Sequence, residues 1–265
     1  LRSIRGKLIT YVPQDPGTAL NPALRIGTQL RESFKGHAAG EAEVLQLLSD
    51  VKLPPVAAFL DAFPHQVSGG QQQRVAIAMA FASRPAAVVM DEPTTGLDVT
   101  TQSHVLDTIR RLCAKHGVAA LYVTHDLAVV ASLADRVSVM YSGRIVEMGS
   151  ASVLLTEPTH PYTRALIRAV PDLEGPVLLK GIPGQAPVPT DRPKGCAFVP
   201  RCSMAIAACR EAPPLVSRLS ADHEVRCIRS DVRVSSDVQL GREAAVVERI
   251  GPPLLEVKAL RAFHG

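Results

Sequence analysis

Strand-like and helix-like patterns alternate along the first 150 residues. Short apolar runs typical of β-strands lie at residues 8–12, 86–90 and 118–123. Apolar side chains with helical spacing lie at residues 42–51, 75–82 and 105–112. The second and third strand-like runs are continuously apolar, which predicts strands buried on both faces. The alternation of the two patterns predicts an α/β fold with a parallel sheet.

A different pattern follows this α/β region. Residues 137–148 have the pattern of a β-hairpin that turns at Ser142-Gly143. Residues 158–214 contain 11 of the 21 prolines, and four of the five cysteines lie within residues 196–227. We therefore expect a first domain over 1–153 and a loop-rich second domain over 154–230. The polar residues 231–253 are expected to form a linker.

Composition and charge exclude several classes of protein. The chain has 265 residues, of which 46% are hydrophobic and 20% charged, as in ordinary globular proteins. Its net charge of +4 is too small for the dense basic stripe of a nucleic-acid-binding protein. No apolar stretch approaches the ~18 residues of a membrane span, and no secretory leader pattern opens the sequence. Composition thus favours a cytosolic protein.

Polar residues follow three of the predicted strands. Asp91 and Glu92 end one apolar run, where open α/β sheets bind ligands. A carboxylate such as Asp91 suits Mg²⁺, and Glu92 suits a general base that polarises water, although a solvated acidic turn is the alternative. His125 ends the next run and could contact a phosphate or be structural. Gln14 could orient water or a metal-bound water.

The segment Ser68-Gly69-Gly70-Gln71 directly precedes an apolar helix. Ser68 is a good N-cap, and the two glycines allow a close approach to the backbone. Exposed amide groups at a helix start, together with the helix dipole, form an anion site. A plain helix cap after a turn is the alternative interpretation.

The order and spacing of these features resemble the ATP-binding cassette of ABC transporters. Gln14 matches the Q-loop, Ser68-Gly69-Gly70-Gln71 the signature motif, Asp91-Glu92 the end of Walker B, Thr95-Gly96-Leu97-Asp98 the D-loop and His125 the switch histidine. The resemblance implies an ABC-type P-loop NTPase fold with a helical subdomain over about residues 28–84. It also implies an ATP that lies between two cassettes.

The same resemblance implies a role for each of these residues. Asp91 and Gln14 would hold Mg²⁺, and Glu92 would activate water. Gln14 and His125 would sense the γ-phosphate. Ser68, Gly69, Gly70 and Gln71 would contact the ATP of the partner cassette, next to the D-loop residue Asp98. Phosphoryl transfer depends mostly on positioning and charge stabilisation, which such dispersed polar groups supply.

A phosphate-binding loop of the form G-x-x-x-x-G-K-[ST] is missing from the sequence. None of the seven lysines fits this pattern, and the resemblance places the loop upstream of Gln14. We therefore expect a cassette truncated before the Q-loop, which lacks its N-terminal strands. On this interpretation, the isolated chain binds ATP poorly and is inactive.

Four cysteines, Cys196, Cys202, Cys209 and Cys227, have the spacing C-x5-C-x6-C-x17-C. Four thiolates can hold zinc or an iron–sulfur cluster, but zinc sites usually contain a C-x2-4-C pair, which is absent here. Four free thiols are the alternative. Cys113 stands apart on a predicted helix, where we expect a small core residue.

Two further segments resemble the C-terminal extension of dipeptide/oligopeptide ABC importer ATPases. They are residues 159–166, with His160-Pro161-Tyr162, and residues 195–202. This resemblance implies a [4Fe–4S] cluster on the four cysteines. Residues 254–265 resemble the first strand of another cassette, which implies a tandem two-cassette protein.

The resemblance as a whole predicts an ATP-hydrolysing subunit that energises peptide import at the cytoplasmic face of the membrane. Its expected partners are a second cassette, two transmembrane permease subunits and, indirectly, an extracytoplasmic solute-binding protein. Two alternatives remain open: a soluble ABC ATPase acting on ribosomes or DNA, and a non-hydrolytic module that contributes only its signature face. The sequence leaves the solute open among dipeptides, longer peptides and nickel chelates.

Overall fold

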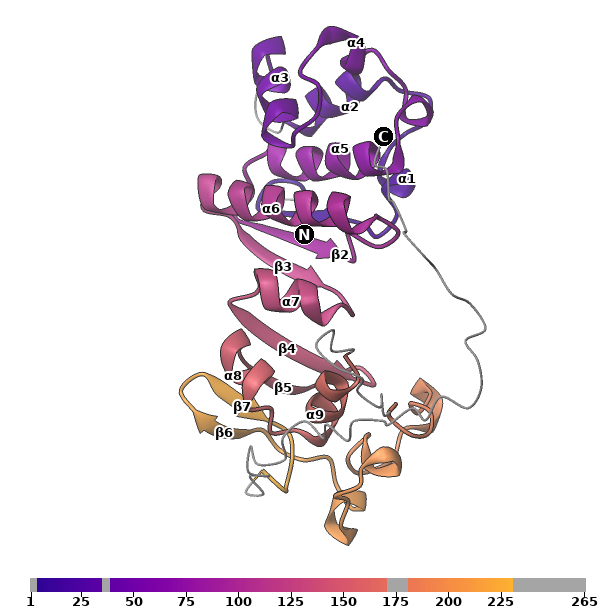
Figure 1. The fold of residues 1–265 in the computed structure, drawn as a ribbon, viewed down its shortest axis with the longest axis vertical. Coiled ribbons are helices and arrows are strands. Elements are labelled where there is room, and N and C mark those ends of the chain that lie inside the picture. The colour runs from indigo at the N-terminus through magenta and orange to yellow at the C-terminus, as the bar shows by residue number, and fades with distance from the viewer. Residues whose placement is uncertain (1–3, 35–38, 171–180, 231–265) are drawn as a thin grey trace, which may run out of the picture. The chain divides into compact units, whose positions relative to one another are not determined.

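The computed structural model describes residues 4–34, 39–170 and 181–230. The chain divides into two compact units, residues 1–135 and 136–265 (Figure 1). The expected linker at 231–253 and the expected strand at 254–265 lie outside the described residues.

The first unit is a three-stranded sheet with helices. Its elements are β1 (Ile9–Val12), α1 (Pro16–Ala19), α2 (Ile26–Ser33), α3 (Glu41–Asp50), α4 (Ala57–Leu60), a 3₁₀ turn (Pro64–Gln66), α5 (Gly69–Ala82), β2 (Ala87–Asp91), α6 (Val99–His116), β3 (Ala119–Val123) and α7 (Leu127–Leu133). The strands are parallel in the order β1-β2-β3. All the strand and helix segments predicted from the sequence within this unit are therefore present, with shifted bounds.

The register of the sheet aligns the carboxyl ends of its strands. Val12 lies opposite Met90, and Asp91 lies opposite Val123. Because the strands are parallel, the residues that follow them leave the sheet at the same edge. Gln14, Glu92 and His125 are therefore brought to one place.

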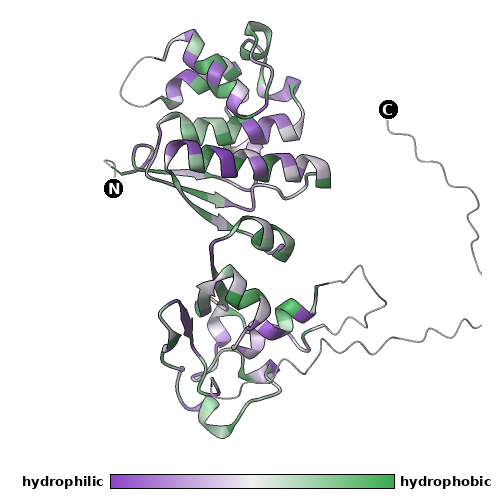
Figure 2. Cartoon of the chain, turned by 60° about the vertical axis from the view of Figure 1, so that its left-hand side comes forward, coloured by the Kyte–Doolittle hydropathy of each residue, from purple (hydrophilic) through white to green (hydrophobic). Residues whose placement is uncertain are grey.

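Helices cover one face of this sheet. Val12, Val88 and Met90 are fully buried in the core that also contains side chains of α5 and α6. On the opposite face, Tyr11 is 57% exposed and Leu121 is 60% exposed. The prediction of strands buried on both faces is wrong for the described residues, because α5 and α6 pack on one side only. Figure 2 shows the strands of the sheet coloured mostly as hydrophobic.

The helices between β1 and β2 pack on one another through apolar stripes. In α3, Val44, Leu47 and Leu48 are buried, as their i, i+3, i+4 spacing predicts. Helix α5 is the longest of these helices at 14 residues, and buried side chains follow most of its length. Its N-terminus begins directly after Ser68, so the glycines of the predicted signature segment form its first turn.

The second unit is an antiparallel sheet with short helices and turns. Its elements are β4 (Arg136–Tyr141), β5 (Arg144–Ser150), α8 (Ala151–Thr156), α9 (Pro161–Arg168), three 3₁₀ turns (Pro189–Asp191, Val199–Arg201 and Ala207–Arg210), β6 (Ser217–Ser220) and β7 (His223–Val225). The strand order is β4-β5-β7-β6. Strands β4 and β5 form the predicted hairpin, and both turn residues, Ser142 and Gly143, have positive φ angles of 47° and 76°.

The hairpin belongs structurally to the second unit. Strand β5 pairs with β7, so that Glu147 lies opposite Val225. The division between the units consequently falls after Asp135, whereas the sequence predicted the end of the first domain near residue 153. The sequence pattern does not predict this pairing, because the two strands are more than 70 residues apart.

A buried carboxylate and an aromatic cluster hold the second unit together. Both oxygens of Glu147 accept hydrogen bonds, from the Thr159 amide (2.7 Å), the His160 amide (3.0 Å) and His223 Nε2 (2.8 Å). The ring of Tyr141 lies 4.6 Å from that of Tyr162 and 5.2 Å from that of Phe198. These contacts fix the start of α9 against the sheet.

A test of the packing in this unit is Gly195→Ala. A Cβ at Gly195 would lie 2.2 Å from the carbonyl oxygen of Cys209, which also accepts a hydrogen bond from the Cys196 amide (2.9 Å). We expect the free energy of unfolding to fall by about 1–3 kcal/mol, because the two backbone segments must separate. Urea unfolding measures the change. Gly181→Ala, which places its Cβ in open space, is the matched control; equal stability of both variants would contradict the close approach.

Candidate functional site

Glu92 is the centre of a hydrogen-bonded group at the carboxyl edge of the parallel sheet. His125 Nδ1 donates to its Oε1 (2.8 Å). Gln14 Nε2 and Thr95 Oγ1 donate to its Oε2 at 3.3 Å and 2.9 Å. The structure thus brings together three residues that the sequence predicted to act together. In the sequence, Gln14 is 78 residues from Glu92, and His125 is 33 residues from it. Thr95, which the sequence placed in the D-loop, is an additional partner.

The backbone aims Glu92 away from the strand. Its φ angle is +43°, a left-handed conformation that is costly for a residue with a side chain. The Glu92 amide donates to the Val123 carbonyl oxygen (2.9 Å), and its carbonyl oxygen accepts from the Thr95 amide (3.1 Å). These two bonds hold the turn after β2 in place, so the strained residue is kept in one orientation.

The contacts of Glu92 and His125 favour the ionised form of both. The hydrogen bonds from His125 and Thr95 lower the pKa of Glu92 below its ordinary value. The hydrogen bond and charge of Glu92 raise the pKa of His125 above its ordinary value of 6.5. The ion pair exists in the pH range above the lowered pKa of Glu92 and below the raised pKa of His125.

Asp91 lies beside this group but on the exposed face of the sheet. Tyr11 donates from its hydroxyl to Asp91 Oδ2 (3.2 Å), and residues 11 and 91 are on neighbouring strands. Partial desolvation of the hydroxyl, the charge of Asp91 and this hydrogen bond raise the pKa of Tyr11. No hydrogen bond to Asp91 Oδ1 occurs within the described residues, so one carboxylate oxygen is available to a ligand.

The signature segment forms a capping box at the start of α5. The Ser68 amide donates to Gln71 Oε1 (2.9 Å), and the Gln71 amide donates to Ser68 Oγ (3.3 Å). Ser68 and Gly69 are exposed, and a Cβ at Gly69 would meet nothing. Because Ser68 Oγ uses a lone pair in this bond, its hydroxyl hydrogen is free to donate outward.

The D-loop residue Asp98 caps the neighbouring helix α6. It accepts from the Thr101 amide (2.9 Å) and from Thr101 Oγ1 (2.7 Å), which lower its pKa. A Cβ at Gly70 would lie 3.1 Å from Thr101 Cγ2, so the starts of α5 and α6 are close neighbours. Within the described residues, no hydrogen bond joins the Ser68–Gln71 segment to the group around Glu92. The two sets of predicted site residues therefore remain separate in this structure.

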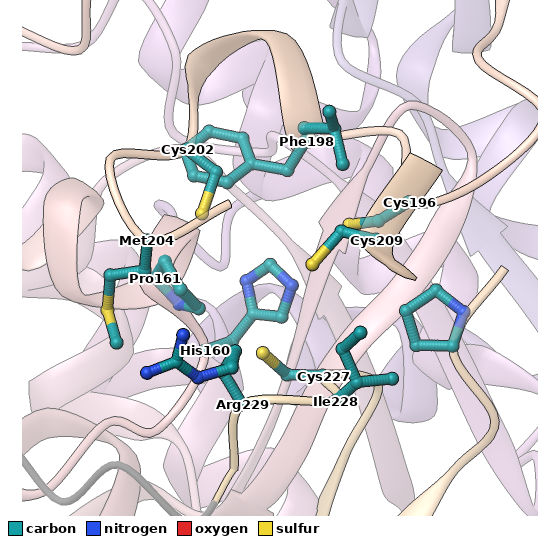
Figure 3. A pocket seen from close by; sticks show the side chains of 12 residues that line it. His160, Pro161, Cys196, Phe198, Cys202, Met204, Cys209, Cys227, Ile228 and Arg229 are labelled. Atoms are coloured by element: carbon teal, nitrogen blue, oxygen red, sulfur yellow. The ribbon is translucent and has the colours of Figure 1, made fainter. Parts of the chain in front are cut away.

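The four cysteines of the second unit line one pocket (Figure 3). Cys196 and Cys202 flank the 3₁₀ turn Val199–Arg201, Cys209 lies in the 3₁₀ turn Ala207–Arg210, and Cys227 follows β7. The sulfur atoms of these four residues turn toward the same space. All four are free thiols, as is Cys113 on α6. Over the described ranges, no group of three or more His, Cys, Asp or Glu side chains is arranged to hold a single metal ion.

Nearby backbone amides influence three of the cysteine thiols. The amides of Phe198, Met204 and Arg229 each act to lower the pKa of the cysteine thiol two residues earlier. Burial acts in the opposite direction and is the larger effect, so the pKa values of Cys196, Cys202 and Cys227 are raised. Burial thus favours the neutral form of these three thiols, whereas the neighbouring amides favour the thiolate.

Sequence reasoning missed two residues that organise these sites. Tyr11, which contacts Asp91, lies within the predicted strand at residues 8–12, where the sequence predicts no further role for it. Glu147 lies within the predicted hairpin, although it is 1% exposed and holds the start of α9. An acidic residue flanked by Val146 and Met148 in a strand was the one available signal.

Comparison with known proteins identifies the family of the chain. The family described as "ABC transporter" matches residues 2–95, and the family described as "Oligopeptide/dipeptide transporter, C-terminal region" matches residues 146–209. The chain belongs to the ATP-binding proteins of peptide ABC importers. A putative peptide import ATP-binding protein of Brucella melitensis is 42% identical over 233 residues, which are 86% of this chain and 70% of the relative. The dipeptide transport ATP-binding protein DppD of Escherichia coli K12 is 41% identical over 232 residues, 85% of this chain and 71% of the relative.

Solved ABC structures are also similar to this chain. One is the dimeric ATP-binding cassette MJ0796 in a post-hydrolysis state bound to ADP and Pi, with a TM-score of 0.47, 29% identity and coverage of 55% of this chain and 64% of that one. Another is CbiO1 of Clostridium perfringens, part of the ABC transporter complex CbiONQ, with a TM-score of 0.49, 27% identity and coverage of 56% and 59%. Because both TM-scores are below 0.5, the assignment of the ABC ATPase fold and of ATPase activity rests on the family.

No helix in the described parts of this importer subunit is long and apolar enough to cross a membrane. The matched C-terminal region contains three of the four pocket cysteines, and Cys227 lies beyond it.

The Glu92–His125 contact can be tested by NMR titration of the His125 ring. We expect a His125 pKa above 6.5 in the unaltered chain and a lower value in Glu92→Gln, because the amide neither carries a charge nor favours an imidazolium. The contribution of the pair to stability is present below pH 6.5 as long as Glu92 is ionised, and it is lost as pH rises through the raised pKa of His125. Glu41→Gln, on an exposed helix start, should leave the titration unchanged. An unshifted His125 pKa in Glu92→Gln would show that the contact is absent in solution.

Proposed function

We propose that this chain is an ATP-hydrolysing subunit that energises peptide import, acting at the cytoplasmic face of the membrane. The arrangement that carries the proposal is Glu92, held at the carboxyl edge of the parallel sheet by His125, Gln14 and Thr95. The C-terminal region that matches oligopeptide/dipeptide transporters directs the proposal to peptide import rather than to another ABC activity. The names of the relatives agree with it.

Glu92 acts as the general base in this proposal. Its lowered pKa keeps the carboxylate ionised at neutral pH, so it can accept a proton from the water that attacks the γ-phosphorus of ATP. The bond between the γ-phosphorus and the β,γ-bridging oxygen breaks, and ADP leaves. His125 carries a proton when paired with Glu92, and it is therefore suited to donate a hydrogen bond to a γ-phosphate oxygen.

The side chains of Asp91 and Gln14 offer the hard oxygen ligands that Mg²⁺ prefers. Asp91 Oδ1 is open to a ligand, and the Gln14 amide donates through Nε2, which leaves its oxygen for a cation. A bound Mg²⁺ would neutralise phosphate charge. Tyr11 orients the carboxylate by its hydrogen bond to the other oxygen.

The Ser68–Gln71 segment contacts the ATP held by a second cassette. The free hydroxyl hydrogen of Ser68 and the exposed amides of the first turn of α5 are donors suited to phosphate oxygens. Asp98 is positioned next to this turn through Thr101 and Gly70. None of the seven lysines of the sequence provides a phosphate loop, so the 265 residues by themselves are expected to hold ATP weakly.

The partners in this proposal are a second cassette, as another subunit or in tandem, two transmembrane permease subunits and, indirectly, an extracytoplasmic solute-binding protein. The helical region of α2 to α5 would transmit the closure of the two cassettes to the permeases. Residues 154–230 would form an accessory domain of the importer.

Peptide uptake by the source cells tests the proposed function. Glu92→Gln is expected to reduce the uptake of a labelled dipeptide by roughly 10²–10⁴-fold at equal protein level, because the attacking water loses its base. Glu41→Gln is the matched control for an exposed acidic residue.

Other outcomes of the uptake test point to the two alternatives. Undiminished uptake in Glu92→Gln together with lost uptake in Ser68→Arg would indicate a non-hydrolytic partner module. Undiminished uptake in both variants, with no co-purifying permease subunits, would favour a soluble ABC ATPase.

We also propose that the cysteine pocket holds a [4Fe–4S] cluster. The donor set fits, because Cys196, Cys202, Cys209 and Cys227 line one space and backbone amides near three of them favour the thiolate form. Cluster ligands bind four different iron atoms, so they need not converge as closely as the ligands of a single ion. When bound, the cluster would supply four iron–sulfur bonds that join the separate loops; ATP hydrolysis needs no electron from it.

Iron and sulfide analysis tests the cluster. An anaerobic preparation of the chain is expected to contain about four iron atoms and about four sulfides per molecule and to absorb broadly near ~400 nm. Cys202→Ser should lower the iron content and the absorbance, because one ligand is lost, whereas Cys113→Ser, outside the pocket, should change neither. A preparation with intact cysteines and no iron would contradict the cluster.

A further inference from the structure

His160 is a buried polar residue in the cysteine pocket with no role in the proposals so far. Its side chain lines the pocket together with the four cysteines, and the residue is only 1% exposed. Figure 3 shows the ring in the middle of the view, with the sulfurs of Cys202, Cys209 and Cys227 around it. The residue precedes α9 and is its N-cap.

The hydrogen bonds of His160 determine where its proton lies. The Tyr162 amide donates to His160 Nδ1 (3.1 Å), as expected for an N-cap. A backbone amide can only donate, so Nδ1 carries no proton. A histidine ring carries at least one N–H, so the proton is on Nε2.

Nε2–H has no acceptor in the protein as described. Over residues 4–34, 39–170 and 181–230, the hydrogen bonds of His160 involve only its backbone and Nδ1. An occupant of the pocket that offers hydrogen-bond acceptors would supply the missing partner.

The position of the ring is fixed independently of any occupant. The His160 amide donates to the buried Glu147 carboxylate (3.0 Å), which also accepts from the Thr159 amide and from His223. The ring of Phe198 lies 6.0 Å from the His160 ring, centroid to centroid. His160 is therefore a preorganised donor rather than a mobile side chain.

We propose that His160 donates a hydrogen bond from Nε2 to a sulfur of the cluster bound by the four cysteines. This inference rests on the [4Fe–4S] cluster proposed above. The sulfides and thiolates of such a cluster are anionic acceptors, which match a fixed N–H donor. His160 is a positioning residue and not an iron ligand, because its Nε2 lone pair is occupied by the proton and four cysteines already complete the ligand set.

A hydrogen bond to a cluster sulfur changes the reduction potential. Reduction adds negative charge to the iron–sulfur core, so a donor stabilises the reduced form and raises the potential. Removal of the donor should therefore make the potential more negative, without loss of iron. A purely structural role of His160 would not produce this shift.

His160→Asn separates the donor from the helix cap. The Asn side chain can accept from the Tyr162 amide, because Asn is among the best N-caps, but it lacks the distal N–H of the ring. Exposed His104 on α6 provides the matched control, His104→Asn. Each protein is prepared anaerobically, its iron and sulfide are measured, and its midpoint potential is determined by reductive titration followed by EPR. Circular dichroism checks that the variants fold.

The expected result is equal iron content in all three proteins, a more negative midpoint potential in His160→Asn and an unchanged potential in His104→Asn. In pulsed EPR of the reduced wild-type cluster, an exchangeable proton coupling from a ring N–H is expected, and it should be absent from His160→Asn.

Three results would overturn the inference. An unchanged potential and proton coupling in an iron-loaded His160→Asn would show that His160 makes no bond to the cluster. Loss of iron in a folded His160→Asn, with strong ¹⁵N coupling from labelled histidine in the wild type, would make His160 a ligand. Wild-type protein without iron would refute the cluster itself and this inference with it.

Discussion

The in-register pairing of three parallel strands is the constraint on which the catalytic half of this protein depends. Val12 opposite Met90 and Asp91 opposite Val123 bring three strand ends to one edge. A slip of one residue would exchange the two faces of a strand. Fully buried Val88 and Met90 would then leave the core, and Asp91 and Glu92 would exchange directions. Packing against α5 and α6 therefore also fixes where the carboxylates point.

The second unit depends on a buried charge instead. Glu147 comes from β5, and its three donors come from the segment before α9 and from β7. A carboxylate buried without donors would be strongly destabilising, whereas three hydrogen bonds stabilise its charge. The need to satisfy this one group ties the hairpin, β7 and α9 together. It also places the N-cap His160 beside the cysteines.

Much of the first unit was predictable, because its information is local. The hydrophobic periodicity predicts α3, α5 and α6. The polar residues Glu92, His125 and Gln14 each follow a predicted strand, and parallel strands bring such residues to a common edge of the sheet. The exposed face of the sheet was not predictable, because an apolar run such as residues 118–123 is the same whether one face or both are covered. The Glu147–His223 pair was also hidden, since it joins residues 76 apart. The cysteine spacing indicated a shared site, but the donors from Phe198, Met204 and Arg229 depend on loop conformation.

Three anionic or potentially anionic centres among the described residues follow the same physical rule. Glu92 and Glu147 are each surrounded by three donors, so their charges are stabilised within the chain. Backbone amides act on three of the pocket cysteines as well, yet burial raises the pKa of these thiols and favours their neutral form, and neutral sulfur is a weak acceptor. The surroundings of the sulfur atoms thus favour more negative charge than neutral thiols carry. Iron would remove this mismatch, because it binds thiolates and so releases the thiol protons. The Nε2–H of His160, which faces the same space, adds one more donor to a site already arranged for anionic sulfur.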